Sequence, residues 1–188
     1  EIADGDWSSD VCSSDLDRRL AATRLLVLDV DGVLTAGGIF MDFEGREYKR
    51  FDVRDGHGIK LAQRHGVDVA IITGRRSAVV EQRARELGIE HVIQGAQRKG
   101  EAFTELLAAT GADPGQVAMV GDDVVDLPVM VRAGLAVTVA DGHPAVRERA
   151  HWTTEACGGH GAVREIVDRL LQAQGHWDAL LAGYLEPG

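Results

Sequence analysis

A run of four apolar residues, Leu25 to Leu28, ends directly at two carboxylates, Asp29 and Asp31, in the order Asp-Val-Asp-Gly. Consecutive apolar residues without alternation are typical of a strand buried on both faces, as in a parallel sheet. Ligands of open α/β sheets bind at the carboxyl ends of the strands, where this pair would lie. Two carboxylates this close repel each other unless a cation or a proton lies between them. The pair therefore indicates a divalent-metal site or, because Asp-Gly is common in turns, a simple turn.

Three later segments place further polar residues close to the carboxyl end of an apolar run or at the start of a helical one. With the first pair, the segments in chain order are Asp29-Val30-Asp31-Gly32, Thr73-Gly74-Arg75, Lys99, and Gly121-Asp122-Asp123 with Asp126 one helical turn later. Together and in this order they resemble the four motifs of the haloacid dehalogenase (HAD) phosphohydrolase superfamily. The resemblance covers about residues 24 to 172.

The resemblance implies a role for each carboxylate. Asp29 would be the nucleophile that forms an aspartyl-phosphate, and Asp31 would protonate the leaving alkoxide and then deprotonate the hydrolytic water. Mg²⁺, which prefers oxygen ligands, would lie between Asp29, the backbone carbonyl of Asp31, and Asp122. Asp123 and Asp126 would support the site.

Two further residues would hold the phosphoryl group. The transition state of phosphoryl transfer spreads negative charge over three oxygens, so catalysis depends on positioning and electrostatic stabilisation. By resemblance, Thr73 and Lys99 would bind these oxygens, and Lys99 would also offset the charge of the carboxylates.

Each of these residues also has a purely structural interpretation. Thr73 could cap the helix that follows it, and Lys99 could be a solvated lysine in the first turn of a helix. Asp122 and Asp126 could be turn and capping residues. All of these interpretations must hold together for the phosphatase hypothesis to fail.

The composition fits a globular enzyme with one substantial core, because 45% of the 188 residues are hydrophobic and 27% are charged. No run approaches the roughly 18 apolar residues of a membrane span. A net charge of −10 argues against nucleic acid as a partner. The two cysteines, Cys12 and Cys157, show no metal-binding spacing and no disulfide framework, which predicts a cytoplasmic protein.

Residues 1–16 are expected to be a non-native, disordered segment, with a HAD-like phosphatase domain over residues 17–188. The segment contains Ser-Ser-Asp twice around Val-Cys and resembles translated sequencing-adapter read-through. It has neither the basic start nor the apolar centre of a signal peptide.

Strand and helix patterns alternate along the remaining chain, which predicts an α/β fold: a single Rossmann-like core with a parallel sheet and helices on both faces. Strands are expected near 25–30, 67–72, 91–93, 117–120 and 135–139, and helices near 56–65, 76–87, 99–110, 124–133, 144–149 and 161–173.

One segment interrupts the alternation. Two short β-patterned stretches flank Glu44-Gly45-Arg46, which predicts a β-hairpin flap over about residues 36–51, directly after the first strand. An insertion of this size is too small to be a cap domain. Its apolar residues would give a free flap a large exposed apolar surface, so we expect another subunit to bury them; the alternative is that the hairpin folds back on its own sheet. These residues are Ile39, Phe40, Met41 and Phe43.

The lack of a cap domain, together with four sequence stretches, points to one family within this superfamily. The matching stretches are 51–60, 71–75, 120–130 and 161–165, and they look like the family of 3-deoxy-D-manno-octulosonate 8-phosphate (KDO 8-phosphate) phosphatases. Membership would imply a homotetramer whose hairpins cover neighbouring sites, and a role in lipopolysaccharide precursor synthesis in a Gram-negative cytoplasm. The residues carried over as substrate-binding are Asp31, Asp52, Val53, Arg54, Asp55, Gly56, Lys60, Arg75, Arg83 and Lys99. Cationic side chains suit a substrate that bears both a carboxylate and a phosphate.

The sequence departs from the family pattern at Ala36, where an acid is common, and at His160, where an arginine is usual. The glycines around His160 lack the following Lys-Ser/Thr of a P-loop and suggest a flexible cover or a helix lead-in.

Two other functions stay open. One is a phosphatase of a nine-carbon sugar acid 9-phosphate (KDN or N-acylneuraminate). The other is a phospho-accepting receiver domain, which is disfavoured because the third predicted strand ends in Gln94-Gly95 and not in an aspartate.

Overall fold

A six-stranded parallel sheet forms the centre of the computed structural model, which describes residues 7–186. The strand order is β5-β4-β1-β6-β7-β8, and every neighbouring pair is parallel. The strands are β1 (Leu25–Leu28), β4 (Asp68–Thr73), β5 (His91–Gln94), β6 (Val117–Val120), β7 (Leu135–Thr138) and β8 (Trp152–Thr153). The predicted α/β fold is confirmed, although the short edge strand β8 was not anticipated.

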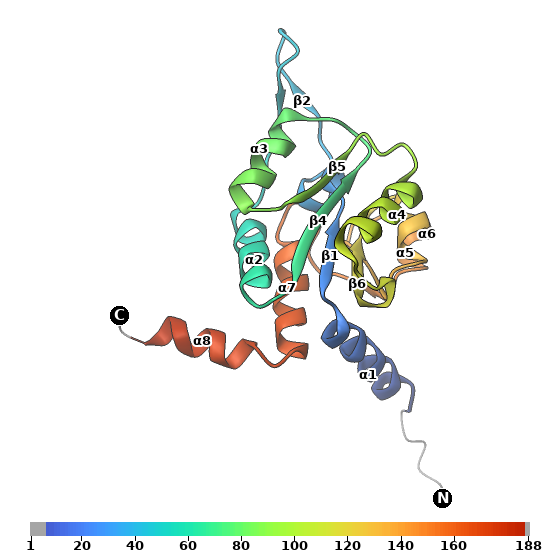
Figure 1. Ribbon diagram of the computed structural model, residues 1–188, viewed down its shortest axis with the longest axis vertical. Helices are drawn as coiled ribbons and strands as arrows, with labels where there is room; N and C mark the ends of the chain where they lie inside the picture. The colour runs from blue at the N-terminus through green and yellow to red at the C-terminus, as the bar shows by residue number, and fades with distance from the viewer. Residues whose placement is uncertain (1–6, 187–188) are drawn as a thin grey trace, which may run out of the picture.

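Helices cover both faces of the sheet (Figure 1). One face packs against α1 (Trp7–Ala22), α2 (Val53–Arg64), α3 (Ala78–Leu87) and α7 (Ala162–Ala173), and the other against α4 (Lys99–Thr110), α5 (Leu127–Met130) and α6 (Pro144–Arg147). Strand β1 contributes side chains to the hydrophobic core on each face of the sheet. Leu26 and Leu28 face the first group of helices, and Leu25 and Val27 face the second. This two-sided burial is the reason that its sequence is continuously apolar.

The sheet has a topological switch point beside β1. The chain passes from β1 outward to β4 and β5, and then returns to β6 on the other side of β1. Asp29 continues the ladder, since its backbone N–H donates to the Val120 carbonyl at the end of β6 over 3.1 Å. Switch points of this kind are where doubly wound sheets bind ligands. The fold therefore brings the segments after β1 and β6 to one place.

Several helices differ from the sequence expectation. Helix α2 begins at Val53, three residues before the predicted start, because the Asp52 side chain accepts a hydrogen bond from the backbone N–H of Arg54 as an N-cap. The predicted helix over 124–133 is a 3₁₀ turn (Val124–Asp126) followed by the single turn α5. Helix α8 (Trp177–Leu185) was not predicted. None of the described helices is long and apolar enough to cross a membrane.

The N-terminal segment differs from the expectation of disorder over residues 1–16. Helix α1 runs from Trp7 to Ala22, and residues 1–6 lie outside the described part of the chain. Asp15 forms ion pairs with Arg18 and Arg19 one turn later, and Leu16 and Leu20 pack against the core. That residues 1–16 are foreign to the natural protein stays a prediction.

The predicted hairpin is present after β1. Its strands β2 (Phe40–Met41) and β3 (Glu47–Tyr48) pair in antiparallel register, and the hairpin projects from the carboxyl edge of the sheet (Figure 1). The paired part is shorter than the 36–51 expected. Between β1 and α2, the described chain holds a short helical turn (Val30–Leu34) and this hairpin, and no cap domain.

Candidate active site

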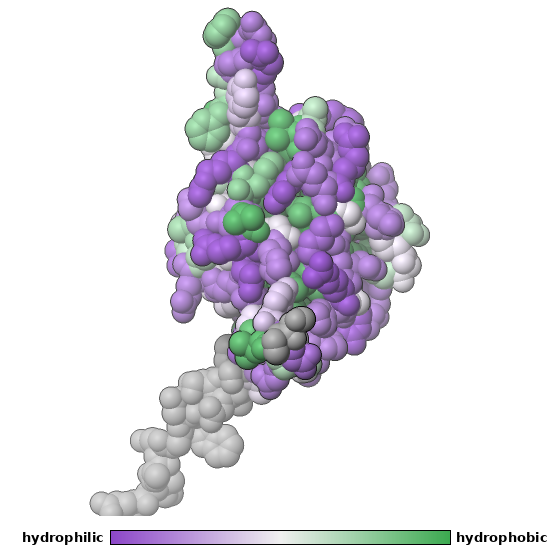
Figure 2. All heavy atoms as spheres, turned by 90° about the vertical axis from the view of Figure 1, so that its left-hand side faces the viewer, coloured by the Kyte–Doolittle hydropathy of each residue, from purple (hydrophilic) through white to green (hydrophobic). Residues whose placement is uncertain are grey.

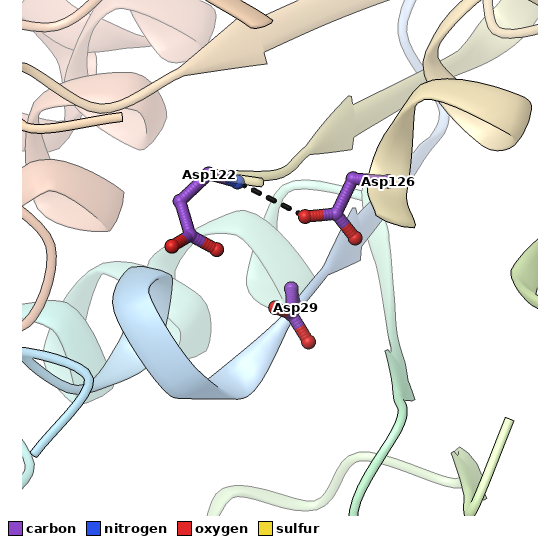
Figure 3. A group of neighbouring side chains, drawn as sticks. All are labelled: Asp29, Asp122 and Asp126. Carbon is purple, nitrogen blue, oxygen red and sulfur yellow. Dashed lines mark hydrogen bonds between the residues drawn. The ribbon is translucent and has the colours of Figure 1, made fainter. Parts of the chain in front are cut away.

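Three carboxylates meet at the switch point (Figure 3). Asp29 follows β1, Asp122 follows β6, and Asp126 ends the 3₁₀ turn after it. One oxygen from each lies within 4.8 Å of the others. Asp29 is 6% exposed and Asp126 is fully buried. Such a concentration of acid in the interior requires a compensating cation.

Lys99 supplies part of that compensation. It is the first residue of α4, is 3% exposed, and lies 2.9 Å from Asp29 Oδ1 and 2.6 Å from Asp126 Oδ1. Burial by itself would lower the pKa of Lys99, but the charges of the two carboxylates outweigh it and raise the pKa. The alternative of a solvated lysine is therefore wrong.

Asp126 uses both of its oxygens within the protein. Its Oδ2 accepts the backbone N–H groups of Asp122 at 3.0 Å and Asp123 at 3.3 Å, while Oδ1 binds Lys99. Asp123 is exposed, and its side chain accepts from the backbone N–H of Val124 at 2.7 Å, which completes a capping box. The capping interpretation is thus right for one oxygen of Asp126, while the other positions Lys99.

The site carries more negative than positive charge. Asp29, Asp122 and Asp126 oppose one lysine, which leaves two net negative charges when all are ionised. Burial raises the pKa of Asp29 to about 6, with the charge of Asp126 adding to the effect and Lys99 opposing it. Burial also raises the pKa of Asp122 to about 7, and the charges of Asp29 and Asp126 contribute. Both carboxylates are therefore costly to ionise here without a further cation.

The same residues fit a divalent metal ion. Asp122 Oδ1 is buried and has no hydrogen-bond partner within the described residues, so it is available as a ligand. Asp29 and Asp122 offer the carboxylate oxygens that Mg²⁺ prefers. An oxygen of Asp126 lies within 4.8 Å of both of them. Gly32 has a φ of +98°, and a Cβ there would lie 2.0 Å from Asp122 Oδ2. A glycine is therefore needed for the segment after β1 to approach Asp122 this closely. A ligand role for the Asp31 carbonyl stays a prediction.

Thr73 lies at the same edge of the sheet. It is the last residue of β4, is 2% exposed, and stands in register with Gln94 of β5. The N-cap of the following helix α3 is Ser77 and not Thr73, so the capping alternative is wrong.

Asp31 is surrounded by cationic side chains. Lys49 Nζ lies 2.5 Å from Asp31 Oδ1, and Arg75 Nε lies 3.7 Å from Asp31 Oδ2. Glu47 binds both cations, at 3.3 Å from Lys49 and 3.0 Å from Arg75. The sequence analysis did not identify Lys49 or Glu47. Their spacing of two places both on one face of a β-strand, which was the available signal.

The substrate-binding residues predicted at the start of α2 have structural partners of their own. Asp52 pairs with Arg54 at 3.2 Å, and this interaction lowers the pKa of Asp52. Asp55 is 1% exposed and accepts the backbone N–H of Arg164 at 2.8 Å, at the start of α7. Burial raises the pKa of Asp55. Val53 is exposed. Their contact with substrate stays a prediction.

The remaining predicted substrate residues, Gly56, Lys60 and Arg83, lie on α2 and α3. Arg83 stacks over the Phe51 ring and pairs with Glu86 at 3.2 Å, and a Cβ at Gly56 would lie 2.4 Å from its guanidinium. The ammonium group of Lys60 lies beside Gly88, at the carboxyl end of α3. The structure thus brings Arg75 and Lys99 to the site, whereas Lys60 and Arg83 lie along α2 and α3.

The glycine-rich loop before α7 is a packed lead-in and not a flexible cover. A Cβ at Gly158 would lie 1.7 Å from the Gly32 carbonyl oxygen, and the backbone N–H of Gly159 donates to Val33 over 2.8 Å. His160 contacts Arg50 at 3.2 Å and its own chain at Gly158. A Cβ at Gly159 would meet the backbone N of Ala36 at 2.4 Å, so the loop also packs on the base of the hairpin.

Comparisons with known proteins identify the family of the chain. A family model described as haloacid dehalogenase-like hydrolase matches residues 57–134. The 3-deoxy-D-manno-octulosonate 8-phosphate phosphatase KdsC of Escherichia coli (strain K12) is 50% identical over 166 residues, which are 88% of each chain. The crystal structure of the phosphatase of that name from Yersinia pestis is 49% identical, covers 87% of this chain and 89% of its own, and has a TM-score of 0.86.

A second solved structure carries ligands. The 3-deoxy-D-manno-octulosonate 8-phosphate phosphatase from Moraxella catarrhalis, in complex with a magnesium ion, a phosphate ion and KDO, is 38% identical to this chain. It has a TM-score of 0.89, and the match covers 91% of this chain and 98% of that one. This chain therefore belongs to the KDO 8-phosphate phosphatase family, a capless branch of the haloacid dehalogenase-like hydrolases.

Proposed function

We propose that this protein is a Mg²⁺-dependent phosphomonoesterase that hydrolyses KDO 8-phosphate to KDO and inorganic phosphate. The observation that carries the proposal is the buried cluster of Asp29, Asp122 and Asp126 with Lys99 at the switch point of the sheet. Two relatives at 49–50% identity are named KDO 8-phosphate phosphatases, which supports this substrate. The relative solved with magnesium, phosphate and KDO supports it too.

In the first step, Asp29 would attack phosphorus while the bond to the sugar oxygen breaks. The product is an aspartyl-phosphate, and the leaving alkoxide would take a proton from the Asp31 carboxyl group. Lys99, which binds Asp29 Oδ1, orients the nucleophile and offsets negative charge near the phosphoryl oxygens. Thr73, at the end of β4, would donate its hydroxyl to one of those oxygens.

In the second step, water would attack the aspartyl-phosphate and restore the free enzyme. Asp31 would take a proton from that water, the bond between phosphorus and Asp29 would break, and inorganic phosphate would leave. Asp31 ends the cycle in the protonated state in which it began. When bound, Mg²⁺ supplies positive charge that offsets the repulsion between these carboxylates and the phosphate.

Asp29 and Asp122 would hold the metal ion through their carboxylates, with Asp31 contributing its backbone carbonyl. Asp126 would position Lys99 and the loop that carries Asp122, because its two oxygens already bind Lys99 and the backbone N–H groups of residues 122 and 123. A receiver domain is a poor alternative, since β5 ends in Gln94 where a receiver would need its phospho-accepting aspartate.

Assembly as a homotetramer is the second part of the proposal. The hairpin exposes a set of large apolar side chains: Ile39 (51%), Phe40 (59%), Met41 (65%), Phe43 (96%) and Tyr48 (54%). Figure 2 shows green residues among purple ones on the part of the molecule that projects from the body. A single chain leaves this surface in water, and a neighbouring copy would bury it. Enclosure by a neighbour would also bring more of the predicted substrate-binding residues around the sugar acid.

We further propose that the reaction takes place in the cytoplasm and supplies KDO for lipopolysaccharide precursors, as the family resemblance implies. The relatives' names favour the eight-carbon acid over a nine-carbon one.

A substrate panel tests the function. The purified enzyme would be assayed with Mg²⁺ against KDO 8-phosphate, KDN 9-phosphate, N-acylneuraminate 9-phosphate and glucose 6-phosphate, with release of inorganic phosphate as the readout. We expect the highest kcat/KM for KDO 8-phosphate. A higher value for a nine-carbon acid would replace the proposed substrate, and no hydrolysis of any ester would contradict the proposed chemistry.

A further inference from the structure

The hairpin carries a buried lysine to the predicted acid–base residue of the same chain. Lys49 follows β3, and its side chain is only 1% exposed. Its ammonium group lies 2.5 Å from Asp31 Oδ1 and 3.3 Å from Glu47 Oε1. A buried ammonium group is costly unless it is paired, so these two carboxylates define where the lysine lies.

Glu47 is in turn held by the core of the protein. Ser77, the N-cap residue of α3, donates its hydroxyl to Glu47 Oε2 over 2.5 Å, and Arg75 binds Glu47 Oε1 at 3.0 Å. The hydrogen bond from Ser77 lowers the pKa of Glu47, which keeps it ionised as the partner of Lys49. The hairpin is therefore attached to the start of α3 through buried and half-buried polar groups.

The hairpin has exposed apolar side chains and buried polar side chains, and the two sets make different contacts. Its apolar side chains are exposed, as described above, whereas Lys49 contacts Asp31 and Glu47 (16% exposed side chain) contacts Lys49. An element whose only role is to cover a neighbour's site would not need a buried ammonium group against its own Asp31. The cost of burying Lys49 points to a task within the same chain.

We propose that Lys49 is a positioning residue that holds the Asp31 carboxyl group in place for its proton transfers, with Glu47 holding Lys49. The hairpin of each chain is then part of its own catalytic site. This inference rests on the proposed function, because it needs Asp31 to serve as the general acid and base. An acid–base group must stay within hydrogen-bond reach of the reacting oxygen, and a displacement of about 1 Å can cost roughly 100-fold in rate.

Two esters with different leaving groups can distinguish whether Lys49 positions Asp31 or binds the phosphate. The test compares Lys49→Met with the wild type on KDO 8-phosphate, an alkyl ester, and on p-nitrophenyl phosphate, whose leaving group needs little protonation. We expect kcat on the alkyl ester to fall on the order of 10- to 100-fold and kcat on the aryl ester to fall about threefold or less. Lys49→Arg, which keeps the cation, should recover part of the alkyl activity.

Two further variants complete the experiment. Arg50→Met removes the same charge from the adjacent exposed residue and should leave both activities near wild type. In the double variant Asp31→Asn/Lys49→Met, kcat on the alkyl ester should be no lower than in Asp31→Asn alone, because the lysine acts through Asp31. Retained aryl activity shows that the variant is folded.

Three results would overturn the inference. They are equal losses on the two esters, which would make Lys49 a phosphate ligand; multiplicative losses in the double variant; and an unchanged Lys49→Met enzyme. These outcomes leave the proposed function intact. A wild-type enzyme that hydrolyses neither ester would instead reject the function itself and this inference with it.

Discussion

Replacing Asp122 by asparagine should stabilise the metal-free protein at alkaline pH while removing its response to Mg²⁺. Asp122 stands in a buried group with Asp29 and Asp126, and only Lys99 offsets their charge. Asparagine has the same shape but cannot ionise, so it relieves the repulsion. A variant expected to be inactive should therefore unfold at a higher temperature than the active enzyme in EDTA.

The pKa of Asp122 gives the magnitude. It is raised from 3.8 to about 7, and at 1.36 kcal/mol per pH unit this difference corresponds to about 4 kcal/mol. The folded protein holds this proton more tightly than the unfolded chain does. The free energy of unfolding of the wild type therefore falls as the pH rises from about 4 to about 7 and stays low above that range. Because the neighbouring carboxylates relax, we expect a gain of about 2 to 4 kcal/mol for the variant at pH 8.

Thermal unfolding in EDTA, followed by circular dichroism at pH 5 and pH 8, measures this gain. It should raise the Tm by roughly 5 to 15 °C at pH 8, since 1 kcal/mol is about 2 to 4 °C for a protein of this size. The difference should shrink at pH 5, where Asp122 is protonated in the wild type. The control is Asp123→Asn, the same change at an exposed cap, which should leave the Tm nearly unchanged. With Mg²⁺ at pH 8, the wild type should gain stability and Asp122→Asn should not. A variant that is no more stable than wild type in EDTA at pH 8 would refute the reasoning.

Three other outcomes follow from the site and the hairpin. Phosphatase activity should vanish in excess EDTA and return with Mg²⁺; undiminished hydrolysis in metal-free buffer would count against the metal site. Asp29→Asn should abolish turnover without unfolding the protein; near wild-type turnover by this variant would contradict the nucleophile assignment. Asp31→Asn should lower the activity on sugar phosphates on the order of 100-fold or more, and the activity on aryl phosphates less. Phe40→Asp/Met41→Asp should give smaller particles by light scattering and a large loss on KDO 8-phosphate, because burying each side chain is worth about 1.5 to 3 kcal/mol; a monomeric, fully active wild type would contradict the tetramer.

The sequence by itself determined the central sheet and the edge at which the site lies. The apolar runs at 25–28 and 117–120 have no alternation, and both are strands buried on both faces. Polar residues that follow such strands must lie at the carboxyl edge of a parallel sheet, which predicts the edge for Asp29 and Asp122, while the family resemblance implied that the two share a metal ion. The hairpin and the lack of a cap domain also followed from local signals, because turn residues and segment lengths act over short distances in the chain.

Only the tertiary structure decided which partners each side chain has. Lys49 meets Asp31 across 18 residues and Asp55 meets the start of α7 across 109, and no periodic pattern specifies such pairs. The structure also gave Asp126 its double role, because one oxygen faces Lys99 while the other caps the loop that carries Asp122. Local patterns record whether a side chain is buried, since burial leaves a period of 2 or 3.6 in the sequence. Which charges meet in the interior depends on how distant segments pack, and that is settled only when the whole chain folds.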